Sequence, residues 1–317
     1  MFVLDTHCDT PSKILEGRDL LIDSSISHVD YPKLKRGGVD GAFFALYVPC
    51  EYDETPELGY QYAMGLLAGI ENSVESNPTL AAFAFSRESA LENRSKGLFS
   101  IFLGLENASP VYNIGKIKEL YDRGIRYITL CHASNNAICD SCASESKKWG
   151  GLSPYGREVI AEMNRLGMLI DVSHVSDDTF YDVLKYSERP VVATHSCCRA
   201  LCNHPRNMSD DMIRALADAG GVIQINFYPV FLSQSCEASY KVIADHIDHV
   251  VDLVGIEHVG IGSDFDGIEI TPKGLEDISG MPVIFDELRA RGYSKTDIEK
   301  IASENFFNVL SSCGGER

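Results

Sequence analysis

The segment LFSIFLGLE, residues 98–106, is a mostly apolar run that ends in a glutamate. Strands buried on both faces of a parallel sheet show such runs, whereas half-exposed strands alternate apolar and polar residues. The segment therefore predicts a buried strand whose one ionisable residue, Glu106, stands at its carboxyl end.

Seven more segments have this character, and segments with helical spacing separate them. A helical segment such as PYGREVIAEMNRLG (154–167) follows a serine cap and closes on a glycine. Eight strands that alternate with helices predict a (β/α)8 barrel of the TIM type, an α/β fold, in which LAAFAF (80–85) is the segment most open to a miscount. The other strand segments are MFVLD (1–5), GAFFALYV (41–48), IRYITLCH (125–132), MLIDVSH (168–174), VVATHS (191–196), VIQINF (222–227) and HVGIGSD (258–264).

The length of the chain fits one such barrel. We expect a single catalytic domain over residues 1–317, because α/β barrels routinely reach this size and no linker rich in Pro, Gly or Ser divides the chain. The part from about residue 281 onward is expected to form a helical tail.

The composition is acidic, with 46 Asp and Glu against 28 Lys and Arg and a formal net charge of −18. Such a charge repels nucleic acids and anionic lipids, so we expect neither a polynucleotide nor a membrane as partner. No apolar run approaches the roughly 18 residues of a membrane span, and the first strand begins where an export signal would stand. These features predict a cytoplasmic location.

The ten cysteines are expected to be reduced thiols in such a location. Cys139 and Cys142 form one C-x-x-C pair, and Cys197, Cys198 and Cys202 form a second group. A four-cysteine zinc site needs two regularly spaced pairs, and the second group lacks that spacing. The sequence therefore disfavours a structural zinc site at these cysteines.

Ionisable residues stand at the carboxyl ends of most of the predicted strands. In a (β/α)8 barrel these ends meet at one mouth, where barrel enzymes carry their chemistry. A lone histidine, or an isolated His-x-Asp pair, is more often a packed or capping residue than a ligand. Seven such groups at one mouth favour a bound cation, because burying them without one would be costly. They are His7, Asp9, Glu106, His132, His174, His195 and Asp264.

Imidazole and carboxylate ligands together favour Zn²⁺, with Mn²⁺ or Co²⁺ as substitutes. Five ligands exceed what one tetrahedral zinc takes, which predicts two ions about 3.5 Å apart that share a carboxylate. Glu106 is the candidate bridge, while His7 and Asp9 point to the same side of an extended strand and Cys8 points away. A hydroxide held between two such ions attacks carbonyl carbon, which predicts hydrolysis of an amide.

Longer motifs carry a resemblance to a known family. They include DTHCDT (5–10), YITLCHASNN (127–136), GLSPYGREVIAEMNRLGMLIDVSHVS (151–176) and GIGSDFDG (260–267). With these motifs the chain resembles, nearly from end to end, the membrane dipeptidase (renal dipeptidase) family, zinc peptidases of the amidohydrolase-like barrels. The resemblance implies a dipeptidase that cleaves L-L dipeptides and also those with a C-terminal D residue. It also implies a homodimer.

The resemblance further implies the arrangement of the metals. His7 and Asp9 would bind the first zinc, His174 and His195 would bind the second, and Glu106 would bridge both. This agrees with the ligand count made from the strand ends.

Further roles follow from the same resemblance. Asp264 would act as general acid and base, and His132 would bind and polarise the substrate carbonyl. Arg206 would bind the C-terminal carboxylate of the dipeptide. Phe231 stands near that carboxylate, where the mammalian members have a tyrosine. Asp266, in contrast, is interpreted as a turn or cap residue.

Two other functions stay open from the sequence. The same barrel and metals could hydrolyse a cyclic amide, a lactone or a modified peptide, or catalyse an isomerisation. A catalytically silent protein that binds a metal or ligand is the second alternative, which is disfavoured because the ligands, Asp264 and His132 occur together.

Overall fold

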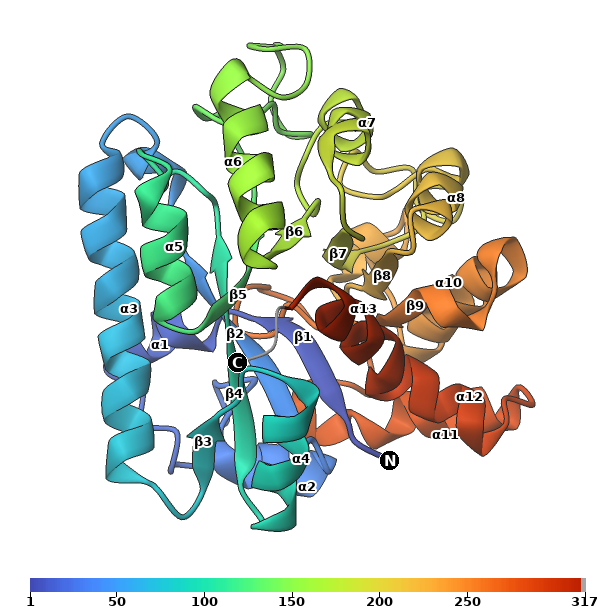
Figure 1. Ribbon diagram of the computed structural model, residues 1–317. Coiled ribbons are helices and arrows are strands. Elements are labelled where there is room, and N and C mark those ends of the chain that lie inside the picture. Colours follow the sequence, from blue (N-terminus) through green and yellow to red (C-terminus); the bar gives the residue numbers. More distant parts are fainter. Residues whose placement is uncertain (315–317) are drawn as a thin grey trace.

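The computed structural model describes residues 1–314, and in this part of the chain eight parallel strands form a nearly closed barrel (Figure 1). They are hydrogen-bonded in the order β1-β2-β4-β5-β6-β7-β8-β9. A bridge between Cys8 and Phe265 joins the end of the first strand to the segment after the last one. The predicted (β/α)8 barrel is confirmed. The strands are β1 (Leu4–Cys8), β2 (Gly41–Tyr47), β4 (Phe99–Glu106), β5 (Ile125–Thr129), β6 (Leu169–Asp171), β7 (Val192–Ser196), β8 (Val222–Ile225) and β9 (Val259–Ile261).

The segment most open to a miscount forms the short strand β3 (Ala81–Phe83), which lies outside the barrel sequence of strands. It pairs in parallel with the first part of β4, where Phe83 lies opposite Ile101. The strand β5 pairs with the same edge of β4 only from Leu103 onward. The short strand β3 therefore fills the edge of β4 that β5 leaves uncovered.

Helices surround the barrel, and those predicted between the strands are present (Figure 1). Three of these predicted helices begin at a serine whose side chain accepts a backbone N–H bond, namely Ser153, Ser176 and Ser209. This bond satisfies one of the amides that the first helical turn leaves unpaired. The α-helices are α1 (Thr10–Leu15), α2 (Tyr31–Gly37), α3 (Pro56–Ser76), α4 (Arg87–Ser95), α5 (Gly115–Asp122), α6 (Pro154–Leu166), α7 (Asp177–Tyr186), α8 (Asp210–Asp218), α9 (Pro229–Leu232), α10 (Tyr240–Val254), α11 (Pro282–Ala290), α12 (Lys295–Glu299) and α13 (Asn305–Cys313). Shorter turns are the 3-10 helices η1 (Cys50–Tyr52), η2 (Ile256–His258) and η3 (Ile278–Gly280) and the π-helix η4 (Lys300–Glu304).

The helix α13 covers the amino-terminal end of the barrel and is drawn in front of the strands in Figure 1. Its Phe306 and Phe307 are buried against side chains that the strands point into the barrel. The ring of Phe306 lies 5.2 Å from that of Phe43, which stacks on Phe102 at 4.8 Å. This aromatic layer closes one end of the barrel and leaves the chemistry to the other end.

Above this layer, Tyr127 of β5 reaches across the barrel interior. Its ring lies against Gly104 of β4, where an added Cβ would stand 2.2 Å from the ring carbon Cζ. Its hydroxyl oxygen lies 2.9 Å from Nδ1 of His7. A glycine in β4 thus makes room for a tyrosine that contacts a predicted ligand.

Among residues 1–314, no helix is both long and apolar enough to cross a membrane.

Candidate active site

A cavity of about 630 Å³ opens at the carboxyl ends of the strands. Its lining includes predicted site residues from the ends of several strands or from the loops that follow them. These are Asp9, Glu106, His132, His174, Arg206, Phe231 and Asp264. His7 and His195 are fully buried directly behind them.

Three ligand-type atoms converge on one side of Glu106. Nε2 of His174 lies 2.9 Å from Nε2 of His195, and these nitrogens lie 3.0 and 3.3 Å from Oε1 of Glu106. Ligand atoms of a tetrahedral zinc, each about 2.0–2.1 Å from the ion, lie roughly 3.3 Å apart. The spacing of this group therefore fits a single zinc-sized ion.

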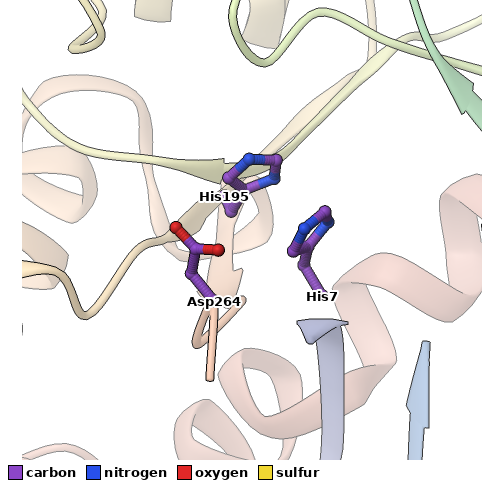
Figure 2. A group of neighbouring side chains, drawn as sticks. All are labelled: His7, His195 and Asp264. Carbon is purple, nitrogen blue, oxygen red and sulfur yellow. The ribbon is translucent and has the colours of Figure 1, made fainter. Parts of the chain in front are cut away.

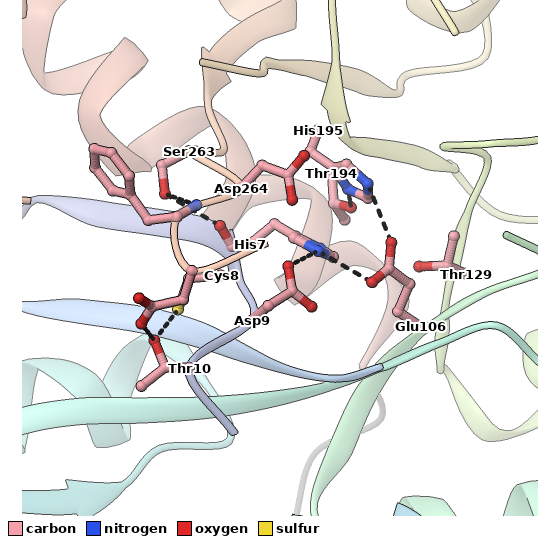
Figure 3. Close-up of polar contacts among 12 residues, drawn as sticks. His7, Cys8, Asp9, Thr10, Glu106, Thr129, Thr194, His195, Ser263 and Asp264 are labelled. Carbon is pink, nitrogen blue, oxygen red and sulfur yellow. Dashed lines mark hydrogen bonds and ion pairs between the residues drawn. The ribbon is translucent and has the colours of Figure 1, made fainter. Parts of the chain in front are cut away.

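A second group lies on the other side of the same glutamate. Nε2 of His7 is 3.5 Å from Oε2 of Glu106 and 3.6 Å from Oδ2 of Asp9 (Figure 3). Both Nε2 of His7 and Oδ1 of Asp9 are buried without a hydrogen-bond partner. Buried polar atoms without partners are costly, and a cation beside them would remove that cost. The donor set thus fits two ions that share Glu106.

A third possible ligand group joins His7 and His195 to Asp264. Figure 2 shows these side chains pointing toward one another from β1, β7 and the segment after β9. His132 belongs to none of the three groups that could hold a metal in the described residues. Its ring lies 4.2 Å from that of His174 and lines the cavity.

The ionisable groups of the cluster strongly shift the pKa values of one another. Burial alone would raise the pKa of Glu106, but the neighbouring His7, His174 and His195 hold it well below its usual range. Burial alone would lower the pKa of His7, but the carboxylates of Glu106 and Asp9 raise it well above its usual value. Burial and the charge of His7 lower the pKa of His195 to about 4. Such opposed shifts in one buried cluster are typical of functional sites.

The backbone at the cavity adopts a conformation that most residues avoid. His174 and Asp264 have φ angles of 71° and 64°, in the left-handed region, and Asn107 directly after Glu106 has φ of 71°. Non-glycine residues in this region are uncommon and cluster at functional sites. At His174 and Asp264, the turn after the strand thus directs a polar side chain to the cavity.

Asp264 is held by residues that the sequence did not single out. Its Oδ2 accepts a hydrogen bond of 2.8 Å from Nδ2 of Asn226. An added Cβ at Gly267 would lie 2.2 Å from Oδ2 of Asp9 and 2.8 Å from Oδ1 of Asp264, so only glycine fits between these carboxylates. The sequence signal for Gly267 was the GSDFDG motif, and Asn226 stands in the strand segment VIQINF.

Asp266 has the structural character expected of it. Its Oδ1 lies 2.6 Å from Nη1 of Arg18, and its Oδ2 accepts a hydrogen bond of 2.9 Å from Thr10. The Asp266 carboxylate therefore ties the loop after β9 to α1 and the loop that follows it.

His132 is held by residues near the end of β2. Its Nδ1 lies 3.8 Å from Sγ of Cys50, and its ring contacts that of Tyr47 edge to face. Burial alone would lower the pKa of His132, but the Cys50 thiol and the Glu106 charge together raise it. These contacts leave Nε2 as the nitrogen available to a bound molecule.

Arg206 is almost completely buried at the side of the cavity. Its Nη2 donates to the backbone carbonyl of His195 at 3.0 Å, while Nε and Nη1 have no partner. The guanidinium carbon lies 5.3 Å from the ring centroid of Phe231. A buried guanidinium with free donors is suited to bind an anionic group.

The cysteines are not part of the candidate ligand groups. All ten are free thiols, and no candidate ligand group in the described residues contains one. Sγ of Cys8 points away from the cavity and lies 3.5 Å from the carbonyl oxygen of Phe43.

Comparison with known proteins places the chain among dipeptidases. A model of the membrane dipeptidase family, peptidase family M19, matches residues 1–314. Dipeptidase verJ of Clonostachys rogersoniana is 36% identical over 325 residues, which cover 98% of this chain and 84% of the relative. Dipeptidase aclJ of Aspergillus oryzae is 35% identical over 297 residues, which cover 91% of this chain and 70% of the relative.

Solved structures agree with the sequence comparison. The metallopeptidase called dipeptidase AC, of family M19, is 26% identical, and the alignment covers 100% of this chain and 99% of that chain with a TM-score of 0.91. A metallopeptidase of Rhodobacter sphaeroides, solved with a phosphinate mimic of the dipeptide L-Ala-D-Ala, is 25% identical with a TM-score of 0.90 and 99% of each chain covered. The chain therefore belongs to the membrane dipeptidase family of metallopeptidases, peptidase family M19.

Proposed function

We propose that this protein hydrolyses dipeptides that carry a free C-terminal carboxylate, in a metal-dependent reaction within a single catalytic domain. The observation that carries the proposal is the position of Arg206. Its guanidinium has two buried nitrogens without partners and lines the same cavity as Glu106 and His174 of the ligand groups. A carboxylate bound there would satisfy these donors.

Two Zn²⁺ ions are the metals we assign to the ligand groups, with Mn²⁺ or Co²⁺ as substitutes. His7 and Asp9 would hold one ion, His174 and His195 the other, and Glu106, with one oxygen toward each group, would bridge them. When bound, such a metal pair supplies a nucleophilic hydroxide at neutral pH and polarises the scissile carbonyl.

The remaining groups bind the dipeptide and move its protons. Asp264, held by Asn226, accepts a proton during the attack and transfers it to the leaving amine. His132 donates a hydrogen bond to the oxygen of the scissile carbonyl. Phe231 packs against the guanidinium of Arg206. It would restrict access of water to the ion pair between Arg206 and the substrate carboxylate. Both L-L dipeptides and those with a C-terminal D residue are proposed substrates, since the relative from Rhodobacter sphaeroides was solved with a mimic of L-Ala-D-Ala.

A cytoplasmic location is proposed as well. It is supported by the ten free cysteines, since a reducing compartment keeps thiols unpaired.

Hydrolysis of a small panel tests the proposed substrate class. The panel contains L-Ala-L-Ala, L-Ala-D-Ala and the amidated peptide L-Ala-L-Ala-NH2, with metal content per chain measured alongside. We expect metal-dependent cleavage of the free dipeptides, loss of activity with a chelator, recovery with zinc, and poor cleavage of the amide. Replacing Arg206 by Met should raise KM for the free dipeptides about 10- to 100-fold, because a hydrogen-bonded charge is lost.

Arg199 offers a matched control for Arg206. Its guanidinium pairs with Asp177 at 2.7 Å outside the cavity, so Arg199→Met should leave KM unchanged. A metal-loaded enzyme that cleaves none of the dipeptides would contradict the proposal and favour another amide or a lactone as substrate.

A further inference from the structure

Asp171, the last residue of β6, lies at the centre of a hydrogen-bond network beneath the ligand group of Glu106, His174 and His195. Its side chain is fully buried and accepts four hydrogen bonds. Oδ1 accepts the backbone N–H groups of Ser173 at 3.0 Å and Thr194 at 2.9 Å. Oδ2 accepts the hydroxyl groups of Thr129 and Thr194, each at 2.6 Å.

The hydroxyl of Thr194 touches two groups at once. Besides Asp171, its oxygen lies 2.9 Å from Nδ1 of His195, the next residue in β7 (Figure 3 shows both side chains). A hydroxyl has one hydrogen, and a carboxylate oxygen can only accept. The hydrogen of Thr194 therefore goes to Asp171, and toward His195 the hydroxyl can only accept.

This direction decides which nitrogen of His195 carries its proton. Nδ1 must donate to Thr194, so that Nε2 of the neutral ring keeps its lone pair. Nε2 is the atom that faces Oε1 of Glu106 at 3.3 Å and Nε2 of His174 at 2.9 Å. The network thus makes Nε2 of His195 present a lone pair, rather than an N–H group, to Glu106 and His174.

We propose that Asp171 is a positioning residue for metal binding, which fixes His195 in its metal-binding tautomer through the hydroxyl of Thr194. The inference deepens the proposed function and rests on the assignment of His195 as a ligand. Partners on the far nitrogen of a ligating histidine orient the ring, and their loss typically costs 10- to 100-fold in metal affinity.

Zinc affinity of the metal-free protein tests this inference without any measurement of hydrolysis. Wild type and variants are stripped of metal, checked for folding by circular dichroism, and titrated with Zn²⁺ against a competing chelator. Thr194→Val removes the acceptor for Nδ1 of His195. Asp171→Asn places a donating NH2 group where the accepting Oδ2 was. The hydroxyl of Thr194 is then free to donate to His195. Both variants should bind zinc 10- to 100-fold more weakly in one of the two binding steps.

Two further variants separate the tautomer from general packing. Thr194→Ser keeps the hydroxyl and should bind zinc like wild type. Thr129→Val removes the other hydroxyl that donates to Oδ2 of Asp171, at the same distance as that of Thr194. Thr129 belongs to β5 and is not next to His195 in the chain. The Thr129→Val variant should have a lower free energy of unfolding and bind zinc with wild-type affinity.

Nitrogen-15 NMR of the histidine rings tests the inference even if Thr194→Val and Asp171→Asn fail to fold. In the metal-free wild type, the His195 signal, identified by its absence in His195→Ala, should show a protonated Nδ1. A protonated Nε2 would overturn the inference, as would wild-type zinc affinity in Thr194→Val or an equal loss of affinity in Thr129→Val. If His195→Ala itself binds two zinc ions normally, the ligand assignment under the proposed function fails, and the inference fails with it.

Discussion

Asp264 combines a left-handed backbone, a hydrogen bond from Asn226 and a place beside His7 and His195. Replacing Asp264 by Asn keeps the shape of the side chain and removes the carboxylate that we propose as the base. We expect metal content near that of wild type and a fall in kcat of about two to four orders of magnitude, the range for loss of a positioned acid or base. Elemental analysis and steady-state kinetics on the same preparation measure both quantities.

Asp266 serves as the control two residues away. Its carboxylate is tied to Arg18 and Thr10, so Asp266→Asn should reduce stability far more than kcat. Normal turnover in Asp264→Asn would show that another group moves the proton.

At the level of single residues, the sequence indicated the groups that end the strands but not those that hold them. His7, Glu106 and His195 stand out because each charged or polar residue interrupts or ends an apolar run. Asp171 and Asn226 also interrupt apolar runs, but the runs do not show the contacts with Thr194 and Asp264 that make these two residues important. Such contacts depend on strand register, which a single sequence does not show.

At the level of elements, the strands lie where the apolar runs predicted them, but two are much shorter. The segments 168–174 and 258–264 contain strands of three residues each, Leu169–Asp171 and Val259–Ile261. The reason lies in the residues that follow, since His174 and Asp264 have positive φ angles that an extended strand does not allow. The apolar pattern shows which residues are buried. The hydrogen bonds between strands end earlier, where the chain turns toward the cavity.

The pair of strands β4 and β5 gives a prediction about packing. A Cβ on Gly104 would overlap the ring of Tyr127, which cannot move without disturbing its contact with His7. We expect Gly104→Ala to reduce the free energy of unfolding by about 1–3 kcal/mol, as overpacked cores do. It should also weaken zinc binding, and denaturant unfolding together with zinc titration measures the two effects.

Gly65, in the middle of α3, provides the opposite case. Nothing lies within 4 Å of a Cβ placed there, so Gly65→Ala should stabilise the protein by about 0.5–1 kcal/mol through helix propensity. If both alanine variants had the same stability as wild type, the close contact between β4 and β5 would be absent in solution.

At the level of the whole molecule, the ligand cluster brings five ionisable side chains into the barrel core, and all five are buried or nearly so. Binding of a metal to the folded state alone stabilises it by about 2.7 kcal/mol when free metal stands at one hundred times Kd. We therefore expect zinc to raise the Tm of the metal-free protein clearly, measured by scanning calorimetry with and without a chelator. The residues concerned are His7, Asp9, Glu106, His174 and His195.

Glu106→Ala, which removes the shared carboxylate, is the control. Its Tm should respond much less to zinc. An equal Tm of the wild type with and without zinc would mean that the cluster does not take up the metal.

The alternation of strands and helices was enough to predict the barrel, because each strand and its covering helix leave a local pattern of burial. Closure of the barrel and the packing of its amino-terminal end left no local pattern. They depend on the backbone bridge between Cys8 and Phe265 and on the ring contact between Phe43 and Phe306. Both pairs join residues that lie far apart in the chain.

The position of α13 has a consequence for synthesis of the protein. The aromatic layer that closes the barrel joins Phe43 to Phe306 and Phe307, which are translated much later than Phe43. Until Phe306 and Phe307 have left the ribosome, β2 and β4 expose one end of an unfinished core. We therefore expect the nascent chain to depend on chaperones and to bind metal only after α13 has emerged, since contacts this distant along the chain form late in folding.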